Sequence, residues 1–579
     1  MGKIRTCQLS TVFEESKATW EEYPRPQMRR NSYISLCGEW ELFCRKGDFG
    51  ALDGSEEKLG RIIVPYPPES RISGIERQIG KDEKYIYRRS FTLPANFNKG
   101  IILIHFGAVD QISRVRINGK YLGVNIGGYL PFEFDITEAV TEGENIIEVE
   151  FMDRLDKDLP YGKQCEKRGG MWYTPISGIW QAVWIESVPD NYIKSLRITP
   201  TLDSVTIEIN GGTEQNEIII RTPNGELVKQ FSGNKVTVEI PDGVLWTPEN
   251  PYLYEFTLNS GNDRVESYFG LRTVTIESRG KRKYICLNGK PYFFHGLLDQ
   301  GYFSDGIYTP ASPEGYIFDI METKKLGFNM LRKHIKIESD LFYYYCDKLG
   351  MIVFQDMVNS GGYNFLIDTA LPTIGLRKGI KHKASRQQKV MFEKCAKGTA
   401  DVLYNHPCVC YYTIFNEGWG QFDADGMYRV LKQHDPTRIW DATSGWFTEK
   451  ESDVQSEHIY FKPVKLKASD RPLVLSEFGG YSFKVDGHSF NLDKNYGYRT
   501  FDSAEKLTEG LKKLYLNEIV PAVENGLCAA VLTQVSDVED ETNGLFTYDR
   551  RVTKVDGKVM VGVAKKLKEA FDKSADNML

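Results

Sequence analysis

Short stretches of alternating hydrophobic and polar residues fill the chain from about residue 32 to residue 188. The clearest examples cover residues 101–106, 114–117 and 146–151. Asn118-Gly119 follows one of them directly, and such dipeptides favour tight turns between antiparallel strands. This pattern predicts an antiparallel β-sandwich in residues 1–189.

A second, smaller sandwich is predicted after this one. Pro189-Asp190-Asn191 interrupts the pattern, and alternating stretches return at residues 205–209, 217–221 and 235–240. Alternation with a period of two is typical of strands that bury one face. We assign residues 190–277 to this second sandwich.

Beyond about residue 278, short hydrophobic stretches alternate with segments of helical periodicity. Ser312-Pro313-Glu314 has the residue types that begin a helix. Eight strand and helix units over about 300 residues predict a (β/α)8 TIM barrel in residues 278–579, with its chemistry at the C-terminal ends of the strands. The candidate strands are residues 292–295, 329–332, 352–356, 411–416, 439–442, 458–460, 473–477 and 529–534.

The charge distribution disfavours nucleic acid and membrane partners. The 73 basic and 79 acidic residues sum to −6, and neither sign forms a block that could follow a phosphate backbone. No run approaches the ~18 apolar residues of a membrane-spanning helix. Residues 1–20 contain charges such as Arg5 and Glu14 where a signal peptide needs an apolar core, so secretion by that route is not expected.

The ten cysteines show no pattern of pairing or metal binding. The chain has no Cys-x-x-Cys pair, and its eight histidines are scattered, so we expect neither a metal site nor a disulfide framework. Cys408 and Cys410 lie in a hydrophobic stretch, where a thiol acts as a small apolar side chain in a reducing compartment. These features predict a cytoplasmic protein that needs no cofactor.

Two predicted barrel strands end in glutamate. Residues 411–415 run into Asn416 and Glu417, and residues 473–476 run into Glu477. One such glutamate would often be only a structural charge near a helix N-terminus. If these are the fourth and seventh strands, however, the two carboxylates face each other across the mouth of the barrel.

Opposed carboxylates at that position indicate hydrolysis of a glycosidic bond. One carboxyl must be protonated to release the leaving group, and the other must be ionised to attack the sugar. A separation of about 5 Å gives retention of anomeric configuration, whereas about 6.5 to 9.5 Å gives inversion. We predict the short separation between Glu417 and Glu477.

The stretch from Asn405-His406-Pro407 to Asn416-Glu417 resembles the acid/base signature of glycoside hydrolase family 2. Residues 24–26, 38–40 and 172–180 resemble the sugar-binding-type domain of that family, and residues 245–254 resemble the end of its middle domain. The family contains retaining β-galactosidases, β-glucuronidases and β-mannosidases. The resemblance implies a jelly-roll β-sandwich in residues 1–189, an immunoglobulin-like β-sandwich in residues 190–277 and a catalytic barrel in residues 278–579.

The same resemblance implies roles for the residues at the two key strands. Glu417 would be the general acid/base and Glu477 the nucleophile. Asn416 would bind the 2-hydroxyl of the sugar, and Arg332 would support the carboxylate of the nucleophile.

Four further residues are expected to bind the substrate. Tyr460, preceded by His458, resembles the aromatic and imidazole residues of the sixth strand, and its phenol would hydrogen-bond Glu477. His334 and Asp356 lie at strand ends, where they would bind sugar hydroxyls, although a structural histidine or a barrel salt bridge is nearly as common there.

The segment before residues 544–546 bears on the identity of the sugar. In this family, β-glucuronidases carry an Asn-x-Lys pair there that binds the uronic carboxylate, whereas this chain has Glu541 and Asn543. A carboxylate at Glu541 would repel a uronic acid, unless the loop is simply a solvated acidic loop. We therefore favour a retaining exo-β-glycosidase that acts on a terminal neutral sugar of an oligosaccharide or glycoside, with a β-galactoside preferred.

Several alternatives stay open at this point. The chain could be a β-glucuronidase or β-mannosidase of the same family, a transglycosylase that uses the same intermediate, or a carbohydrate-binding protein that has lost turnover. Assembly into a homo-oligomer is compatible with each of them.

Overall fold

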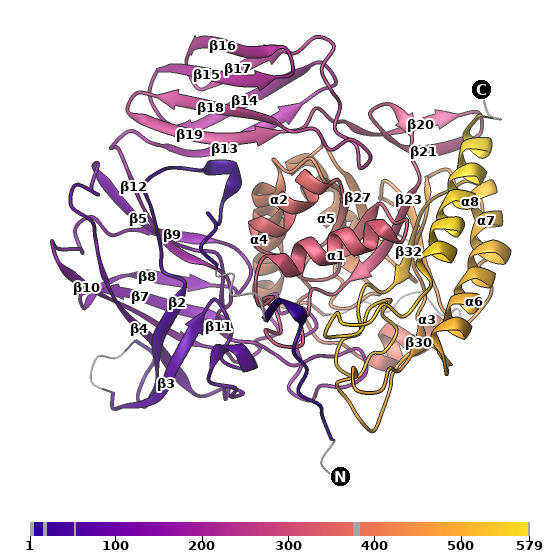
Figure 1. Ribbon diagram of the computed structural model, residues 1–579, viewed down its shortest axis with the longest axis horizontal. Helices are drawn as coiled ribbons and strands as arrows, with labels where there is room; N and C mark the ends of the chain where they lie inside the picture. The colour runs from indigo at the N-terminus through magenta and orange to yellow at the C-terminus, as the bar shows by residue number, and fades with distance from the viewer. Residues whose placement is uncertain (1–4, 15–19, 51–53, 374–382, 448, 577–579) are drawn as a thin grey trace.

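Three packed domains make up the molecule, for which a computed structural model describes residues 5–14, 20–50, 54–373, 383–447 and 449–576. In Figure 1 the N-terminal domain lies on the left, the second domain lies at the top, and the barrel fills the right. The expectation about a signal peptide falls in part on residues 1–4 and 15–19, which lie outside the described residues. Within those described ranges, no helix has both the length and the apolar character needed to cross a lipid bilayer.

Two antiparallel sheets form the N-terminal sandwich. Their strand orders are β1-β12-β5-β9 and β3-β2-β4-β10-β7-β8, and side chains such as Trp40, Ile104 and Val149 form the core between them. The predicted strand at residues 101–106 coincides with β5. The elements are η1 Val12–Glu14, η2 Pro26–Met28, β1 Tyr33–Ser35, β2 Gly38–Arg45, β3 Glu56–Val64, η3 Arg71–Ser73, β4 Lys84–Thr92, β5 Ile101–Phe106, β6 Val109–Asp110, β7 Ile112–Ile117, β8 Lys120–Ile126, β9 Phe132–Asp135, β10 Glu144–Met152, β11 Gly178–Ile179 and β12 Val183–Val188.

The predicted turn at Asn118-Gly119 is confirmed. The two residues join β7 to β8, and their φ angles are 51° and 78°. Asparagine and glycine adopt this left-handed region more readily than other residues, so the dipeptide permits a two-residue hairpin.

The second sandwich is built in the same way from two smaller sheets. Their strand orders are β13-β14-β17 and β16-β15-β18-β19, and Ile207, Ile220 and Phe256 belong to the core between them. Buried and more exposed residues alternate along β14 and β15, which is why the hydrophobic pattern located these strands. The strands are β13 Ile193–Pro200, β14 Ser204–Gly211, β15 Gln215–Thr222, β16 Gly225–Ser232, β17 Lys235–Glu239, β18 Tyr254–Ser260 and β19 Asp263–Phe269.

Eight parallel strands form a nearly closed barrel, in the order β27-β26-β25-β24-β23-β32-β29-β28. Among the described residues no backbone ladder joins the first and last strands of this order, but the Ser456 hydroxyl of β28 donates to the Thr443 carbonyl of β27 over 3.0 Å. All eight predicted strands are therefore present. They are β23 Phe294–Asp299, β24 Met330–Lys333, β25 Ile352–Asp356, β26 Val409–Asn416, β27 Ile439–Ser444, β28 Gln455–Ile459, β29 Leu473–Gly479 and β32 Leu527–Thr533.

Some barrel strands begin and end away from their predicted positions. The first strand was expected at residues 292–295, but Tyr292 donates its backbone N–H to Ile285 over 3.1 Å and so belongs to the preceding hairpin. Barrel strands are buried on both faces, so hydrophobic periodicity does not define their ends. The strands outside the barrel in this domain are β20 Val274–Arg279, β21 Arg282–Leu287, β22 Lys290–Pro291, β30 Tyr481–Phe483 and β31 Arg499–Phe501.

Helices cover the outside of the barrel. In Figure 1, α2 and α4 lie on the side of the N-terminal domain, and α6 to α8 lie on the opposite side. The first helix begins at Glu314, as predicted, and Ser385 caps α4 by accepting the Gln388 N–H over 2.9 Å. The helices are α1 Glu314–Lys325, α2 Asp340–Leu349, η4 Leu366–Ala370, α3 Leu371–Thr373, α4 Arg386–Leu403, α5 Ala424–His434, α6 Ala504–Leu514, η5 Tyr515–Ile519, α7 Val520–Glu524 and α8 Gly557–Asp576.

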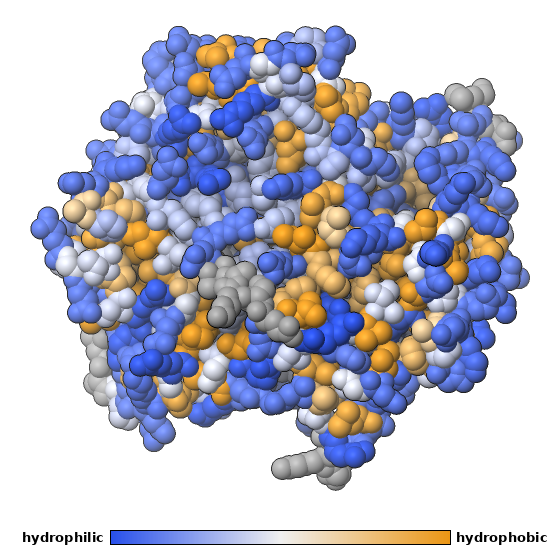
Figure 2. Space-filling model, viewed as in Figure 1, coloured by the Kyte–Doolittle hydropathy of each residue, from blue (hydrophilic) through white to orange (hydrophobic). Residues whose placement is uncertain are grey.

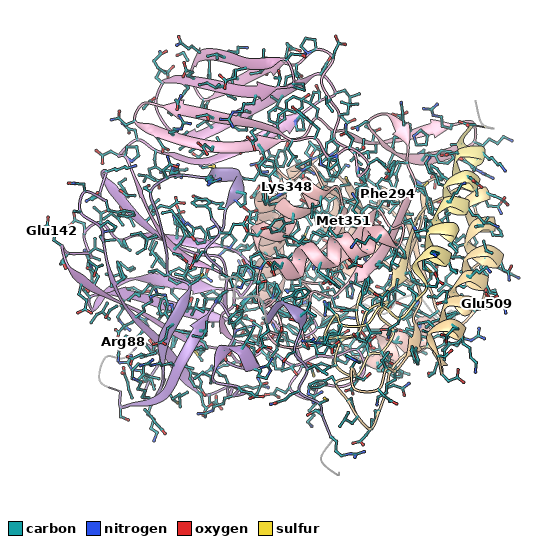
Figure 3. The ribbon with its side chains drawn as sticks, viewed as in Figure 1. Arg88, Glu142, Phe294, Lys348, Met351 and Glu509 are labelled. Atoms are coloured by element: carbon teal, nitrogen blue, oxygen red, sulfur yellow. The ribbon has the colours of Figure 1, made fainter. Side chains whose placement is uncertain are left out.

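Side chains divide between core and surface as expected for a globular protein. Phe294 and Met351 are buried and lie among the barrel elements, whereas the exposed Glu142 and Glu509 lie at opposite edges of the molecule (Figure 3). On the face drawn in Figure 2, hydrophobic residues form separate patches among hydrophilic ones, which is the usual composition of a protein surface.

A buried ion pair of the barrel domain accepts a hydrogen bond from the second sandwich. His406, in the segment before β26, lies 2.6 Å from Asp347 and 2.7 Å from Asp340, both on α2. Tyr268 of β19 donates its hydroxyl to the same Asp347 over 2.8 Å. Burial alone would lower the pKa of His406, but the two carboxylates outweigh it and raise that pKa to about 10.

We expect His406→Gln to destabilise the fold at pH 7 by about 3 to 5 kcal/mol, because Asp347 then stays buried without its cation. Since the folded pKa of His406 lies above its ordinary value of 6.5, its contribution is complete below pH 6.5 and is lost as the pH rises through about 10. Differential scanning calorimetry at pH 7 and above pH 10 measures both effects.

His434→Gln is the matched control, since His434 pairs with Asp401 near the surface over 2.8 Å and its loss should cost less than about 1 kcal/mol. Equal unfolding temperatures for the two variants at pH 7 would contradict this account of the junction.

Candidate active site

Glu417 follows β26 directly and projects into the mouth of the barrel. Its backbone N–H donates to the Ser444 carbonyl of β27 over 2.9 Å, and its φ angle is 53°. A non-glycine residue rarely adopts this left-handed conformation, and such residues gather at functional sites. The next residue, Gly418, has a φ of 73°, and a Cβ there would lie 2.3 Å from the Phe447 ring, so the turn requires glycine.

Glu477 lies within β29 and faces Glu417 across the mouth. A carboxylate oxygen of each glutamate and a ring nitrogen of His458 all lie within 4.8 Å of one another. His458 Nδ1 lies 2.9 Å from Glu417 Oε1, and its Nε2 lies 3.6 Å from Glu477 Oε1. The two carboxylates predicted from strands four and seven therefore share one site, with an oxygen of one within 4.8 Å of an oxygen of the other.

Arg332 of β24 connects the strands around this site. Its guanidinium lies 3.0 Å from Asp356 of β25 and 3.0 Å from Glu477 of β29. It also donates to Asn416 Oδ1 at the end of β26 over 2.9 Å. Because Arg332 is only 1% exposed, these contacts replace the water that its charge would otherwise need.

The surroundings of Glu477 keep its carboxylate ionised. Burial alone would raise its pKa, but His458 and Arg332 outweigh burial and lower the pKa to about 2. Tyr460, which follows β28, donates its hydroxyl to Glu477 Oε2 and lies 2.9 Å from Thr533 Oγ1. The carboxylate is thus an acceptor from two sides.

His334 and Asp356 pair with each other near the same strand ends. His334 Nδ1 lies 2.6 Å from Asp356 Oδ2, and Asp356 Oδ1 accepts from Arg332. Burial and Lys163 lower the pKa of His334 to about 4 despite Asp356, so its imidazole is neutral at pH 7. Both oxygens of Asp356 are occupied, which favours a supporting position for this residue, and its contact with a sugar stays a prediction.

A segment of the N-terminal domain, residues 160–174, lies on the mouth of the barrel, and we call it the mouth segment. Tyr161 donates its hydroxyl to the Gly361 carbonyl over 2.6 Å. Trp172 packs edge-on against Trp419 and Tyr363, with ring centroids 4.7 and 4.9 Å apart. The sandwich therefore contributes side chains to the rim of the site.

Comparison with known proteins identifies the family. The model for the sugar-binding domain of glycosyl hydrolases family 2 matches residues 64–189, that for glycosyl hydrolases family 2 matches residues 191–272, and that for the family's TIM barrel domain matches residues 279–479. The chain belongs to glycosyl hydrolase family 2.

Relatives with different activities resemble this chain. A β-galactosidase of Thermoanaerobacter pseudethanolicus is 27% identical over 381 residues, which are 60% of this chain and 46% of that protein. A β-glucuronidase of Felis catus is 23% identical over 426 residues, which are 65% of this chain and 62% of that protein. The chain spans about half the length of the β-galactosidases that it matches.

Solved family 2 structures share the fold over nearly their whole length. A β-glucuronidase of an uncultured Clostridium species has a TM-score of 0.73 at 19% identity, with 94% of this chain and 99% of that chain covered. A β-galacturonidase from Eisenbergiella tayi has a TM-score of 0.68 at 19% identity, with the same coverage. The predicted fold class and the predicted membership in a family of glycoside hydrolases are confirmed, whereas the domain limits of 1–189, 190–277 and 278–579 stay predictions.

The predicted site residues of this family 2 chain all lie around one barrel mouth. Sequence reasoning missed the mouth segment's contribution, including Lys163 and Trp172, and the tyrosine that stacks on Tyr460, which is Tyr498 at a centroid distance of 4.0 Å. Trp172 was noted only as part of the stretch that resembles the sugar-binding-type domain, and no local pattern marks Lys163 or Tyr498, because their contacts join distant parts of the chain. The proposed site residues are Glu417, Glu477, Asn416, Arg332, His334, Asp356, His458 and Tyr460.

The cluster of Glu417, His458 and Glu477 also has ligand types that could hold a metal ion. A cation bound to Glu477 Oε1, however, would sit beside the Arg332 guanidinium, which already lies 3.0 Å from that oxygen. Charge repulsion therefore disfavours a metal at this position.

We expect Tyr460→Phe to raise the pKa of Glu477 by roughly one unit, because the ionised carboxylate loses a hydrogen-bond donor. The acidic limb of the pH profile of kcat/KM should move to higher pH accordingly. Tyr498→Phe is the control, since it removes a hydroxyl from the same aromatic stack with no hydrogen bond to Glu477. Identical acidic limbs in both variants would rule out this role for the Tyr460 hydroxyl.

Proposed function

We propose that this family 2 enzyme is a retaining exo-β-glycosidase in which Glu417 is the general acid/base and Glu477 the nucleophile. The observation that carries the proposal is the approach of the two carboxylates to within 4.8 Å. That separation leaves no room for a water molecule between the attacking carboxylate and the sugar, as retention requires.

The two glutamates differ in ways that fit these roles. The low pKa of Glu477 suits a nucleophile that must be ionised. The Glu417 side chain is 14% exposed, against 6% for Glu477, so Glu417 is the better placed to exchange protons with water and with a leaving group.

In the first step, Glu417 gives its proton to the glycosidic oxygen as the bond from that oxygen to C1 breaks, and a Glu477 oxygen forms a bond to C1. In the second step, Glu417 takes a proton from water, the water oxygen bonds to C1, and Glu477 leaves as a carboxylate. Arg332 holds Glu477 in position throughout. Among the described residues no group accepts a hydrogen bond from the Asn416 amide nitrogen, so this nitrogen can donate to the 2-hydroxyl of the sugar.

We infer a terminal neutral sugar, with a β-galactoside preferred. Glu541 is buried near the mouth, where it accepts from Tyr173 and, over 3.0 Å, from Gln534, and a uronic carboxylate beside it would meet a like charge. The alternative is a β-glucuronide or β-galacturonide, the activities named for the Clostridium and Eisenbergiella proteins. The mouth segment covers part of the rim, which supports exo action.

We also propose a reducing, cytoplasmic location. All ten cysteines are free, and five of them are buried, which suits a compartment where thiols stay reduced. A binding protein without turnover is less well supported, because it would have no use for an ionised and a proton-exchanging carboxylate in one site.

We expect Glu477→Gln to lower kcat for nitrophenyl β-galactoside at least ~10⁴-fold, because no covalent intermediate forms. Glu417→Gln should lower kcat/KM by roughly 10² to 10⁴-fold for substrates with poor leaving groups and much less for dinitrophenyl glycosides, which need no acid. Undiminished hydrolysis by Glu477→Gln would contradict the assignment of the nucleophile.

A panel of aryl β-galactoside, glucoside, mannoside and glucuronide tests the sugar. NMR of the first product anomer tests retention, and mass spectrometry after treatment with a 2-deoxy-2-fluoro glycoside should locate the label on Glu477. An inverted product would overturn the proposed mechanism, and a wild type that binds but hydrolyses none of the panel would favour the binding protein.

A further inference from the structure

The mouth segment of the N-terminal domain is fixed to the loops that carry the site. Tyr161 donates its backbone N–H to the Asn359 carbonyl, beyond β25, over 2.9 Å. Thr174 donates its backbone N–H to Glu539, beyond β32, over 2.9 Å. A residue between these two anchors therefore holds a defined position above the barrel.

Lys163 is such a residue. Its carbonyl accepts the Tyr173 N–H over 3.1 Å, and its ammonium lies 5.9 Å from the centroid of the Tyr173 ring. Gly162, just before it, has a φ of 68°, and a Cβ there would lie 3.0 Å from the Ile335 carbonyl beyond β24. The backbone thus passes close to the barrel at the base of the lysine.

The ammonium of Lys163 has no ionic partner among the residues that the structure describes. Across the described ranges, no carboxylate lies within 4.0 Å of its Nζ and no hydrogen bond ends on it, and the residue is partly exposed. Lysine charges are normally solvated or paired. A polar group of a bound substrate would supply the missing partner.

The charge of Lys163 acts on the pKa values of three groups of the mouth. These groups are Glu477, Glu541 and His334. Burial is the largest single influence on each: it raises the pKa of the two carboxyls and lowers that of the imidazole. The Lys163 ammonium lowers the pKa of all three groups. The groups come from β29, from the loop after β32 and from the end of β24. Together with the backbone anchors at Tyr161 and Thr174, these effects indicate that Lys163 lies over the mouth rather than at the outer surface of the sandwich.

Glu541 offers an acceptor on the same side. Tyr173 and Gln534 both donate to its Oε2, and within the described residues its Oε1 receives no hydrogen bond. The Tyr173 ring, which lies beside Lys163, thus also connects the lysine to Glu541. The Tyr173 side chain thus lies next to a donor, the Lys163 ammonium, and hydrogen-bonds an acceptor, the Glu541 carboxylate.

We propose that Lys163 is a substrate-binding residue supplied by the N-terminal sandwich, and that its ammonium donates to a hydroxyl at the non-reducing end of the terminal sugar while Glu541 accepts from that end. This inference rests on the proposed glycosidase function, since Glu477 must hold C1 of the sugar for its far end to reach these groups.

The charge balance favours a hydroxyl over a carboxylate at this position. A hydroxyl accepts from the ammonium and donates to the Glu541 oxygen, so both protein groups are satisfied. A uronic carboxylate would pair with Lys163 but would lie beside a second negative charge on Glu541. Lys163 and Glu541 together therefore select a neutral sugar.

Lys163→Met tests the contact directly. We expect kcat/KM for nitrophenyl β-galactoside to fall roughly 10- to 100-fold, the usual effect of losing a hydrogen bond from a charged donor. Lys167→Met, which removes an exposed lysine from the same segment, should leave kcat/KM unchanged. Thermal unfolding should be equal in both variants, which separates a lost contact from a lost fold.

Glu541→Gln tests the selectivity. Without the repelling carboxylate, Lys163 can pair with a uronic acid, so the ratio of galacturonide to galactoside kcat/KM should rise at least roughly tenfold. Adding Lys163→Met to this variant should abolish the gain. A wild type that prefers the galacturonide, and loses that preference in Lys163→Met, would overturn the proposed neutral sugar.

Failure of this inference and failure of the proposed function give different results. If wild type and Lys163→Met hydrolyse the galactoside equally while Glu477→Gln does not, the lysine contact is wrong and the glycosidase stands. If the wild type hydrolyses no glycoside, calorimetric titration with D-galactose decides the contact separately. Binding that is lost in Lys163→Met then supports the contact, and equal binding overturns it.

Discussion

The guanidinium of Arg332 is the interaction on which the site depends. It is enclosed by the barrel, and its donors reach the ends of β25, β26 and β29 at once. A buried cation of this kind is tolerable only if its partners stay in place. The position of Glu477 and the orientation of the Asn416 amide therefore both depend on this charge. Through these contacts Arg332 also holds β26 and β29 in fixed positions relative to each other.

Much of this could be predicted from the sequence, because the decisive signals are local. The turn at Asn118-Gly119 and the alternation along β14 depend on neighbouring residues only. Glu417 and Glu477 could be singled out because each follows a run of mainly hydrophobic residues in the sequence. Their pairing required the order of strands around the barrel, which the (β/α)8 pattern supplies.

The remaining features could not be predicted, for physical reasons. The contact from Thr174 to Glu539 joins residues 365 positions apart, and nothing in either segment encodes the other. The same holds for Lys163, because the three groups on which its charge acts belong to three separate segments of the barrel domain. Strand limits such as that of β23 were missed because burial on both faces removes the alternation that would mark them.

The mouth segment also limits how far the three domains are independent units. Its anchors and its tryptophan cover Trp419 and Tyr363, so a barrel expressed alone would present this aromatic rim to water and would have an incomplete site. A catalytic domain transplanted from this chain into another scaffold would therefore have to include residues 160–174. More than a hundred residues separate this segment from the first barrel strand.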